Sequence, residues 1–410
     1  MSPKEVGGVS SVVNNLCNAM IAKNQIQPIV WIIDWNAYEP QIELKESGVI
    51  EMRWRIHPLC DETISVKSLK KALWEARQLK MLNYILHYFN VDVINSHFPG
   101  DAAFGLMEWL LSVSKKLPVN PSVVLSFHGS DIVNWNEKPK RTKEKLKKLI
   151  SKMRGAGFHV TGTGCSSALC DQVNQVIGIP DFSWALHNGV NAEVMVNADA
   201  KAKPKELSEP YIINIGKFDN AIKGQLDLIK AFALVSGSVE QNLVLVGGSS
   251  NEIDNLIKPA IVSLGLQKRV HIFANVPHDE VGAYLRDADA FVLSSRREAF
   301  AISLMEAGVL HVPVLAPNIP GVMECLGFDA AHDIAQCETG VLFERAPNNE
   351  AQHAQALSNG IKQVLGLSPL KDAAQSIESR IKNFLNLIEE ERDWGAVTEK
   401  LRNGSFSKKH

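Results

Sequence analysis

Two glutamates, Glu298 and Glu306, flank a mostly apolar segment in the stretch SSRREAFAISLMEA, residues 294–307. On one continuous helix their carboxylates would be turned about 80° apart and separated by roughly 12 Å along the axis, so they would not act as a close pair. If Glu298 lies in a loop and Glu306 in the second turn of the following helix, both can face one ligand at the helix N-terminus. The spacing therefore predicts a ligand site, and the rest of the chain must supply a cleft around it.

The elements that would position these glutamates are short apolar runs alternating with helical patterns, which is typical of parallel βαβ units. The predicted strands are 27–34, 91–98, 122–129, 158–164 and 184–190 in the first half, and 211–218, 242–248, 269–276, 290–295, 312–317 and 339–345 in the second. Residues 196–209 are polar and contain a proline, so they predict a linker. We expect an α/β protein with two doubly wound, Rossmann-like domains, and ligands in the cleft where these face each other.

The expected domains are residues 1–195 and 196–373, followed by a segment of helical pattern, residues 374–410. Gly7 and Gly8 look like the turn between a first strand and its helix, yet only six residues precede them. A central strand of the first domain is therefore expected to be missing or truncated.

The composition excludes an integral membrane protein and a disulfide scaffold. The chain is 45% hydrophobic and 21% charged, and no apolar run approaches the roughly 20 residues that span a bilayer. Its six cysteines form no C-x-x-C pair, so reduced thiols are favoured over disulfides or a zinc site. We expect a cytoplasmic protein, and one that can associate with a membrane surface.

Several motifs occur in an order and spacing that together are specific. They are GGV near the start, SFHGSD at 126–131, HNGVN at 187–191, NIGKFDNAIKG at 214–224, LVLVGG at 243–248, the E-x7-E pair and PVLAPNIPGVMEC. With these motifs the chain resembles the retaining glycosyltransferases of family 4. The resemblance implies the two-domain GT-B fold, transfer of a sugar from a nucleoside diphosphate to an acceptor, and a C-terminal segment that crosses back towards the N-terminal domain.

The resemblance also implies roles for individual residues. Lys223 and Lys217 would neutralise the diphosphate, Glu298 would hold the donor sugar, and Glu306 would hold the ribose. Catalytic roles fall to His128, Glu298 and Lys223, and the donor would be bound by Gly8, Lys217, Lys223, Glu298, Ala301, Ile302, Ser303 and Glu306. His97 and Asn188 are weaker candidates for the acceptor side.

The chain departs from the family pattern at three positions in these motifs. It has Lys217 where the family more often has Arg, and Ala299 and Ala301 where the family usually has Gly. A lysine acts as a point charge instead of a two-pronged donor, and two added methyl groups narrow the pocket for the sugar. No carboxylate stands out as a nucleophile, and no Asp-x-Asp triplet is expected to hold a divalent ion. The resemblance implies a front-face displacement that requires no cofactor and no metal.

Residues 138–154 hold nine Lys and Arg and one Glu, with an apolar stripe at helical spacing. The stripe should pack on the first domain and leave a cationic face. Such a face is usually only solvated, but its density of charge favours an anionic membrane or a lipid-linked acceptor. No nucleic-acid partner is expected, because basic and aromatic residues do not interleave.

The resulting hypothesis is a metal-independent hexosyltransferase that moves sugar from a nucleotide-sugar donor to a carbohydrate or lipid-linked acceptor. We expect it to act in bacterial surface or extracellular polysaccharide, lipopolysaccharide or glycolipid assembly. Two alternatives remain open, a nucleotide-sugar epimerase of the same fold and a catalytically silent nucleotide-sugar-binding protein.

Overall fold

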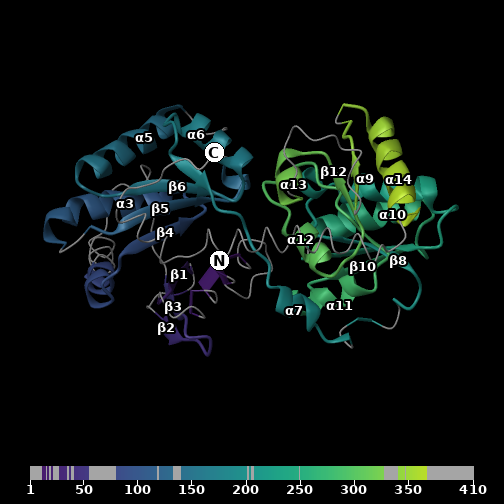
Figure 1. Cartoon of the computed structure of the whole chain (residues 1–410), viewed down its shortest axis with the longest axis horizontal. Coiled ribbons are helices and arrows are strands. Elements are labelled where there is room, and N and C mark those ends of the chain that lie inside the picture. Colours follow the sequence, from purple (N-terminus) through teal and green to yellow (C-terminus); the bar gives the residue numbers. More distant parts are fainter. Residues whose placement is uncertain are drawn as a thin grey trace. The chain divides into compact units, whose positions relative to one another are not determined.

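The computed structural model describes residues 12–14, 16–17, 20–21, 27–34, 37, 41–54, 80–117, 120–132, 140–200, 203–204, 207–248, 250–326, 340–346 and 348–366. They divide into two compact α/β units, formed mainly by residues 16–187 and by residues from 188 onward (Figure 1). Gly8 and the C-terminal segment 374–410 lie outside the described residues. Within the described part of the chain, no helix combines the length and apolarity needed to cross a membrane.

The described strands of the first unit form two sheets. The strands are β1 (Ile29–Ile33), β3 (Ile50–Trp54) and β2 (Gln41–Leu44) in one sheet, and β4 (Val93–His97), β5 (Ser122–Phe127), β6 (Val160–Gly164) and β7 (Ser183–Ala185) in the other. The second sheet is parallel and keeps its strands in chain order. Its connections include α3 (Asp101–Val113), α5 (Lys140–Gly155) and α6 (Ser167–Ile177), with α5 packed between α3 and α6 (Figure 1).

Strands β2 and β3 form a hairpin that the sequence did not predict. β2 pairs antiparallel with β3, and all four of its side chains are exposed. The turn uses Gly48 at φ +86°, where the Lys45 N–H bonds to the Val49 carbonyl at 2.9 Å. A short, solvent-facing strand gives no continuous apolar run, so only the turn glycine could have indicated it.

The second unit is built on one six-stranded parallel sheet in the order β10-β9-β8-β11-β12-β13. The strands are β8 (Tyr211–Ile215), β9 (Asn242–Gly247), β10 (Val270–Ala274), β11 (Ala290–Val292), β12 (Val314–Pro317) and β13 (Gly340–Phe343). The order reverses between β8 and β11, and in such sheets ligands bind beyond the carboxyl ends of the strands at that reversal.

Helices cover this sheet and supply its core. They are α7 (Ala192–Val196), α8 (Asn220–Lys223), α9 (Gln225–Val235), α10 (Lys258–Ser263), α11 (Val281–Arg286), α12 (Ile302–Val309), α13 (Pro320–Cys325) and α14 (Glu350–Gly366). One core cluster joins the strands to α9, α10 and α14, with Phe232, Ile261 and Leu357 among its buried side chains. These three helices therefore share one face of the sheet.

Helix α7 packs within the second unit, although the sequence analysis assigned residues up to 195 to the first domain. Arg286 Nη2 on α11 donates to the Val196 carbonyl at 2.7 Å. A Cβ built on Gly282 would lie 2.2 Å from the Met195 carbonyl oxygen, so α7 and α11 make direct backbone contact. The main part of the first unit accordingly ends at His187, and the second continues from Asn188.

Candidate functional site

Helix α8 and the segment after β11 meet at the sheet reversal of the second unit. Gly224 ends α8 with φ +65°, and a Cβ at this position would lie 2.4 Å from the Ser294 carbonyl oxygen. Ser294 Oγ donates to the Lys223 carbonyl at 2.8 Å. Only a glycine satisfies both the backbone angle and the close approach, so the sequence brings the ends of β8 and β11 together here.

Lys223 and Glu298, two of the residues singled out from the sequence, contact each other at this point. Lys223 Nζ lies 2.5 Å from Glu298 Oε1, and Ser295 Oγ donates to the same oxygen at 2.7 Å. The Lys223 side chain is 25% exposed and that of Glu298 is 9% exposed. The two side chains are mostly buried and offer a cation next to a hydrogen-bonded carboxylate. This combination suits a ligand that carries both phosphate and hydroxyl groups.

Glu306 lies in the second turn of α12, as the sequence predicted, and its side chain is buried. Its Oε1 is 2.7 Å from Nε2 of His278, which follows β10. The hydrogen bond to Glu306 raises the pKa of His278 above its usual range, against the opposing effect of burial. The sequence analysis missed His278, although a histidine just beyond a predicted strand could have marked it.

The start of α12, four residues after Glu298 in the chain, presents backbone donors. Ile302 and Ser303 are its first two residues, so their N–H groups lie at the helix N-terminus. The N–H of Ala301, also predicted to face phosphate, is directed at Cys325 Sγ, 3.2 Å away. A Cβ on Gly321 would lie 2.4 Å from the Glu298 carbonyl oxygen, so α13 packs directly on this segment.

In the described part of the chain, Lys217 and Asn188 form no hydrogen bond or ion pair with Lys223 or Glu298. Lys217 follows β8 and is exposed, and its carbonyl accepts a hydrogen bond from Gln225 Nε2 at 2.8 Å. Asn188 is buried at the start of the second unit. The roles of Lys217 in donor binding and of Asn188 on the acceptor side therefore stay predictions.

In the first unit, His97 and His128 contact each other at the ends of adjacent strands. His97 ends β4 and His128 follows β5, and His97 Nδ1 lies 2.9 Å from His128 Nε2. The ring centroids are 5.2 Å apart with planes 22° apart. A nitrogen–nitrogen contact of this length with nearly coplanar rings is the geometry of an edge-to-edge hydrogen bond.

Burial keeps both imidazoles neutral. It lowers the pKa of His97 to about 4, and burial together with the neighbouring His97 lowers the pKa of His128 to about 3. A neutral imidazole has one donor and one acceptor nitrogen, so one ring donates to the other. The two nitrogens outside this bond, His97 Nε2 and His128 Nδ1, then offer one donor and one acceptor between them.

Asp131 fixes the turn that carries His128. Its carboxylate accepts hydrogen bonds from the backbone N–H groups of His128 at 3.1 Å, Gly129 at 2.8 Å and Ile132 at 3.0 Å. Gly129 has φ +105°, which allows the chain to turn back onto Asp131. The SFHGSD motif is therefore a rigid turn whose acidic residue has a structural role.

Two family models match this chain and meet near the end of α7. One, described as Glycosyltransferase Family 4, matches residues 6–194, and the other, described as Glycosyl transferases group 1, matches residues 196–383. The chain belongs to glycosyltransferase family 4. This confirms the family that the sequence motifs indicated.

Relatives of this family 4 protein align over part of their length. The N-acetyl-alpha-D-glucosaminyl L-malate synthase of Bacillus anthracis is 24% identical over 58% of this chain and 59% of its own length. A D-inositol 3-phosphate glycosyltransferase of Corynebacterium glutamicum is 23% identical over 62% of this chain and 60% of its own length. The chain thus spans about three fifths of the curated relatives it matches first.

Solved structures show the fold. Sucrose-phosphate synthase of Thermosynechococcus elongatus aligns with a TM-score of 0.71 at 17% identity, over 97% of this chain and 94% of that chain. Anabaena HepE in complex with UDP aligns with a TM-score of 0.62 at 16% identity, over 95% of this chain and 96% of that chain. The family 4 protein has the GT-B fold, as expected.

Candidate metal ligands do not gather at the Lys223–Glu298 pair. Among the residues that the structure describes, no three His, Cys, Asp or Glu side chains group in a way that could hold a metal ion. The expectation of metal independence rested partly on the absence of an Asp-x-Asp triplet, and this was wrong, because Asp287-Ala288-Asp289 is such a triplet. It lies at the amino end of β11, where Asp287 pairs with Lys203 and Asp289 accepts a hydrogen bond from Gln241.

Proposed function

We propose that this family 4 protein is a retaining glycosyltransferase that moves a hexosyl-type sugar from a nucleoside diphosphate sugar to an acceptor hydroxyl. The contact between Lys223 and Glu298 at the sheet reversal is the observation that carries the proposal. A nucleotide sugar needs a cation for its phosphates and acceptors for its hydroxyl groups, and this pair offers both. The complex of the similar Anabaena protein with UDP supports a nucleotide donor.

In the proposed reaction each residue has a distinct role. Lys223 stabilises the negative charge that develops on the leaving diphosphate, assisted by the N-terminal N–H groups of α12. Glu298 accepts hydrogen bonds from the donor sugar, and Glu306, held by His278, accepts them from the ribose. The neutral His128 contacts the transferred sugar, and the leaving phosphate takes the proton of the acceptor hydroxyl. No metal is required in this scheme.

The relatives support a place in glycolipid or surface polysaccharide assembly. A 90-residue segment, 21% of this chain, is 33% identical to the O-antigen biosynthesis glycosyltransferase WclY of Escherichia coli. Three of the other relatives are named D-inositol 3-phosphate glycosyltransferases, and another is named phosphatidylinositol N-acetylglucosaminyltransferase GPI3 subunit. We propose a carbohydrate or lipid-linked acceptor for this chain on that basis.

A nucleotide panel tests the proposal. A nucleotide that binds the folded state at 100 times its Kd should stabilise it by about 2.7 kcal/mol, which thermal denaturation detects as a raised Tm. UDP, GDP and ADP should be compared first, and then sugar conjugates of the nucleotide that binds. Transfer to an acceptor with the anomeric configuration retained, read by NMR, is the expected result. Conversion of the donor without acceptor would favour the epimerase, and binding without turnover would favour the silent protein.

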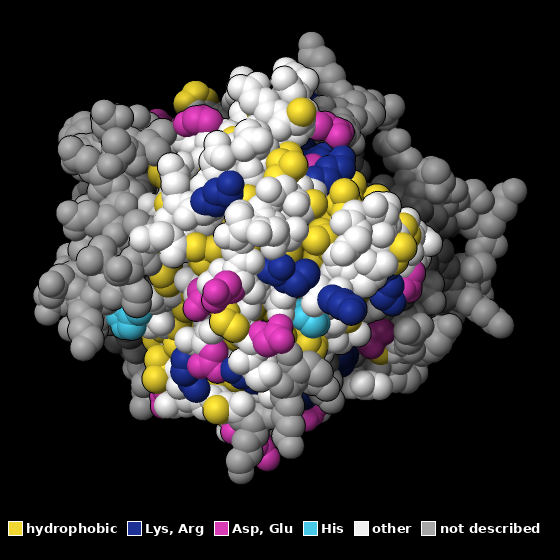
Figure 2. All heavy atoms as spheres, turned by 90° about the vertical axis from the view of Figure 1, so that its right-hand side faces the viewer, with side chains coloured by type: hydrophobic (Ala, Val, Ile, Leu, Met, Phe, Trp, Pro, Cys, Tyr) yellow, Lys and Arg dark blue, Asp and Glu magenta, His cyan; other side chains and the backbone are white. Residues whose placement is uncertain are grey.

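We also propose that α5 attaches the protein peripherally to an anionic membrane. Its apolar stripe, Leu146, Leu149, Ile150 and Met153, is buried in the first unit as the sequence predicted. Part of the positive charge is used internally, since Lys145 pairs with Glu108 and Lys147 donates to the Gly178 carbonyl. By contrast, the face of the second unit seen in Figure 2 interleaves basic and acidic side chains.

Vesicle binding tests this attachment. Lys148 and Lys152 are exposed on α5, so K148E/K152E should weaken binding to vesicles of anionic phospholipid by at least about 30-fold. Each basic residue near such a surface is worth about 1 kcal/mol, and raised salt should have the same effect as the substitutions. The matched control is K268E, at an exposed lysine of the second unit. Equal binding by all three proteins would contradict the proposal.

A further inference from the structure

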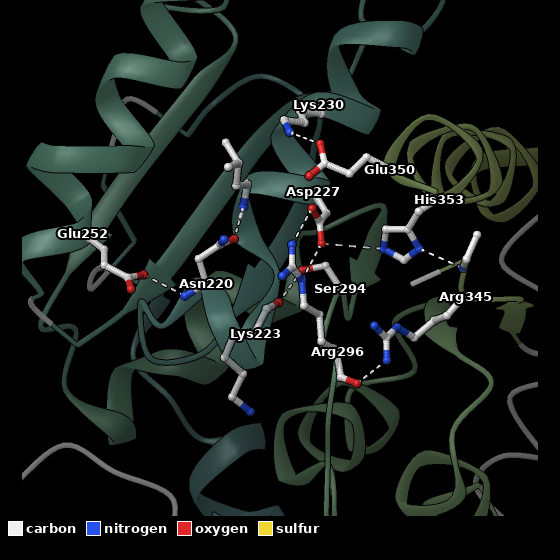
Figure 3. Close-up of polar contacts among 12 residues, drawn as sticks. Asn220, Lys223, Asp227, Lys230, Glu252, Ser294, Arg296, Arg345, Glu350 and His353 are labelled. Carbon is white, nitrogen blue, oxygen red and sulfur yellow. Dashed lines mark hydrogen bonds and ion pairs between the residues drawn. The ribbon is translucent and has the colours of Figure 1, made fainter. Parts of the chain in front are cut away.

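Arg296 lies between β11 and α12, two positions before Glu298. The side chain of Arg296 points away from Lys223, the residue that pairs with Glu298 (Figure 3). Its guanidinium forms a bidentate pair with Asp227, with Nε 2.8 Å from Oδ2 and Nη2 2.9 Å from Oδ1. Asp227 is buried in the first turn of α9. Two parallel hydrogen bonds between planar charged groups fix orientation as well as distance.

The backbone of Arg296 makes two further contacts. Its N–H donates to the Ile222 carbonyl on α8 at 2.7 Å, and its carbonyl accepts a hydrogen bond from Arg345 Nη1, which follows β13 (Figure 3). One residue therefore joins α8, α9 and the connection between β13 and α14. Since α8 ends with Lys223, the contact with Ile222 joins the segments that carry the two members of the Lys223–Glu298 pair.

His353 on α14 completes the surroundings of Asp227. Its Nε2 lies 3.7 Å from Asp227 Oδ2, and its ring is buried. Burial lowers the pKa of His353, and the positive charges of Arg345 and Arg296 lower it further against the attraction of Asp227. The histidine is therefore neutral at physiological pH, and Arg296 is the charged partner of Asp227.

We propose that Arg296, held by Asp227, is a positioning residue that sets the distance between Lys223 and Glu298 and so preorganises the donor site. Neither side chain of the Arg296–Asp227 pair contacts Lys223 Nζ or the Glu298 carboxylate in the described structure. The effect passes through the backbone, because Arg296 N–H and Ser294 Oγ both bond to carbonyls of α8. The catalytic consequence rests on the proposed function, since a sugar and a diphosphate must be held together.

Neutral replacements separate positioning from stability. R296M leaves a buried carboxylate without its partner, so both Tm and kcat should fall. R296M/D227N removes that orphan charge, so Tm should recover while kcat stays about 10²-fold below wild type, because a small displacement of reacting groups is enough to cause such a loss. R296K keeps the charge but not the two-pronged geometry, and we expect kcat about tenfold low at nearly unchanged Tm.

The matched control is K230M, which breaks an exposed ion pair between Lys230 and Glu350 that also joins α9 to α14. It should keep wild-type kcat and KM. Wild-type kcat in R296M/D227N at restored Tm would overturn the inference and leave the proposed function standing. A wild type that transfers no sugar would instead defeat the proposed function.

A crystal structure of R296M/D227N decides the positioning claim whatever the activity. We expect Lys223 Nζ to have left its position 2.5 Å from Glu298 Oε1. If this contact persists unchanged, Arg296 does not set the distance and the inference is wrong. Weaker UDP binding by the double variant, measured by calorimetry, would support it independently of transfer.

Discussion

Replacing Lys223 by methionine is expected to lower kcat/KM for sugar transfer by about 10²- to 10³-fold, the loss typical of removing one group that stabilises transition-state charge. In the proposed reaction the lysine is the cation nearest the leaving diphosphate. Methionine keeps most of the length of the side chain and removes the charge. Because Lys223 is 25% exposed and Glu298 keeps its hydrogen bond from Ser295, the fold should survive. Steady-state kinetics with the identified donor measure the effect.

The control for K223M is K230M, because Lys230 pairs with Glu350 on the surface and has no part in the site. It should retain wild-type kcat/KM and Tm. Transfer by K223M within threefold of wild type would contradict the role assigned to Lys223. If circular dichroism shows that K223M has lost the folded state, kcat/KM should be compared between wild type and K223R instead. K223R keeps a positive charge and should retain part of the activity.

Acidification from pH 6.5 to 4 is expected to destabilise the first unit. His97 binds a proton with a pKa of about 6.5 when unfolded and about 4 when folded, so in this interval the unfolded chain holds more protons and stability falls as the pH falls. The shift of 6.5 − 4 = 2.5 pKa units corresponds to about 3 kcal/mol at 1.36 kcal/mol per unit. His128, with its pKa lowered to about 3, changes stability in the same direction.

Tryptophan fluorescence can report this loss for the first unit alone. All eight tryptophans lie outside residues 188–388, so urea denaturation followed by indole emission is insensitive to most of the second unit. The urea concentration at the midpoint of unfolding should decrease as the pH is lowered from 6.5 to 4. His278 in the second unit has a raised pKa, so its contribution is present at low pH and is lost as the pH rises through that pKa.

The control for the pH experiment is H97N/H128N, in which the pair can no longer be protonated. Its midpoint should depend less on pH between 6.5 and 4 than that of the wild type. Some dependence will remain, because burial also lowers the pKa of His159 in the first unit. An unchanged pH dependence would show that the histidine pair does not control the acid stability of this unit.

The parallel strands could be predicted because burial on both faces gives them continuous apolar runs, as in β5 and β9. The sequence could not show that the described strands of the first unit form two sheets, since pairing depends on contacts between distant segments. Helix α7 was placed by its contact with Gly282, far along the chain. Local polarity around residues 196–209 gave no information about that contact.

Parts of the site were within reach of sequence reasoning and others were not. Lys223 and Glu298 are 75 positions apart, and a parallel sheet that reverses its order between β8 and β11 explains why they meet. His97 and His128 were each noticed at a strand end, but their hydrogen bond was not foreseen. The sequence analysis assigned no role to Arg296, because only tertiary structure reveals a buried partner such as Asp227.

The ion pair between Lys223 and Glu298 has a consequence for selectivity in the proposed reaction. Each charge already pairs with the other, so inorganic phosphate can bind the lysine only if the Glu298 carboxylate loses its cationic partner and keeps the hydrogen bond from Ser295 alone. A nucleotide sugar avoids that penalty, because its sugar hydroxyl groups can donate hydrogen bonds to Glu298 while its phosphate oxygens bind Lys223. The ion pair would thus lower the affinity of the site for the small anions of a cell relative to its affinity for the complete nucleotide sugar.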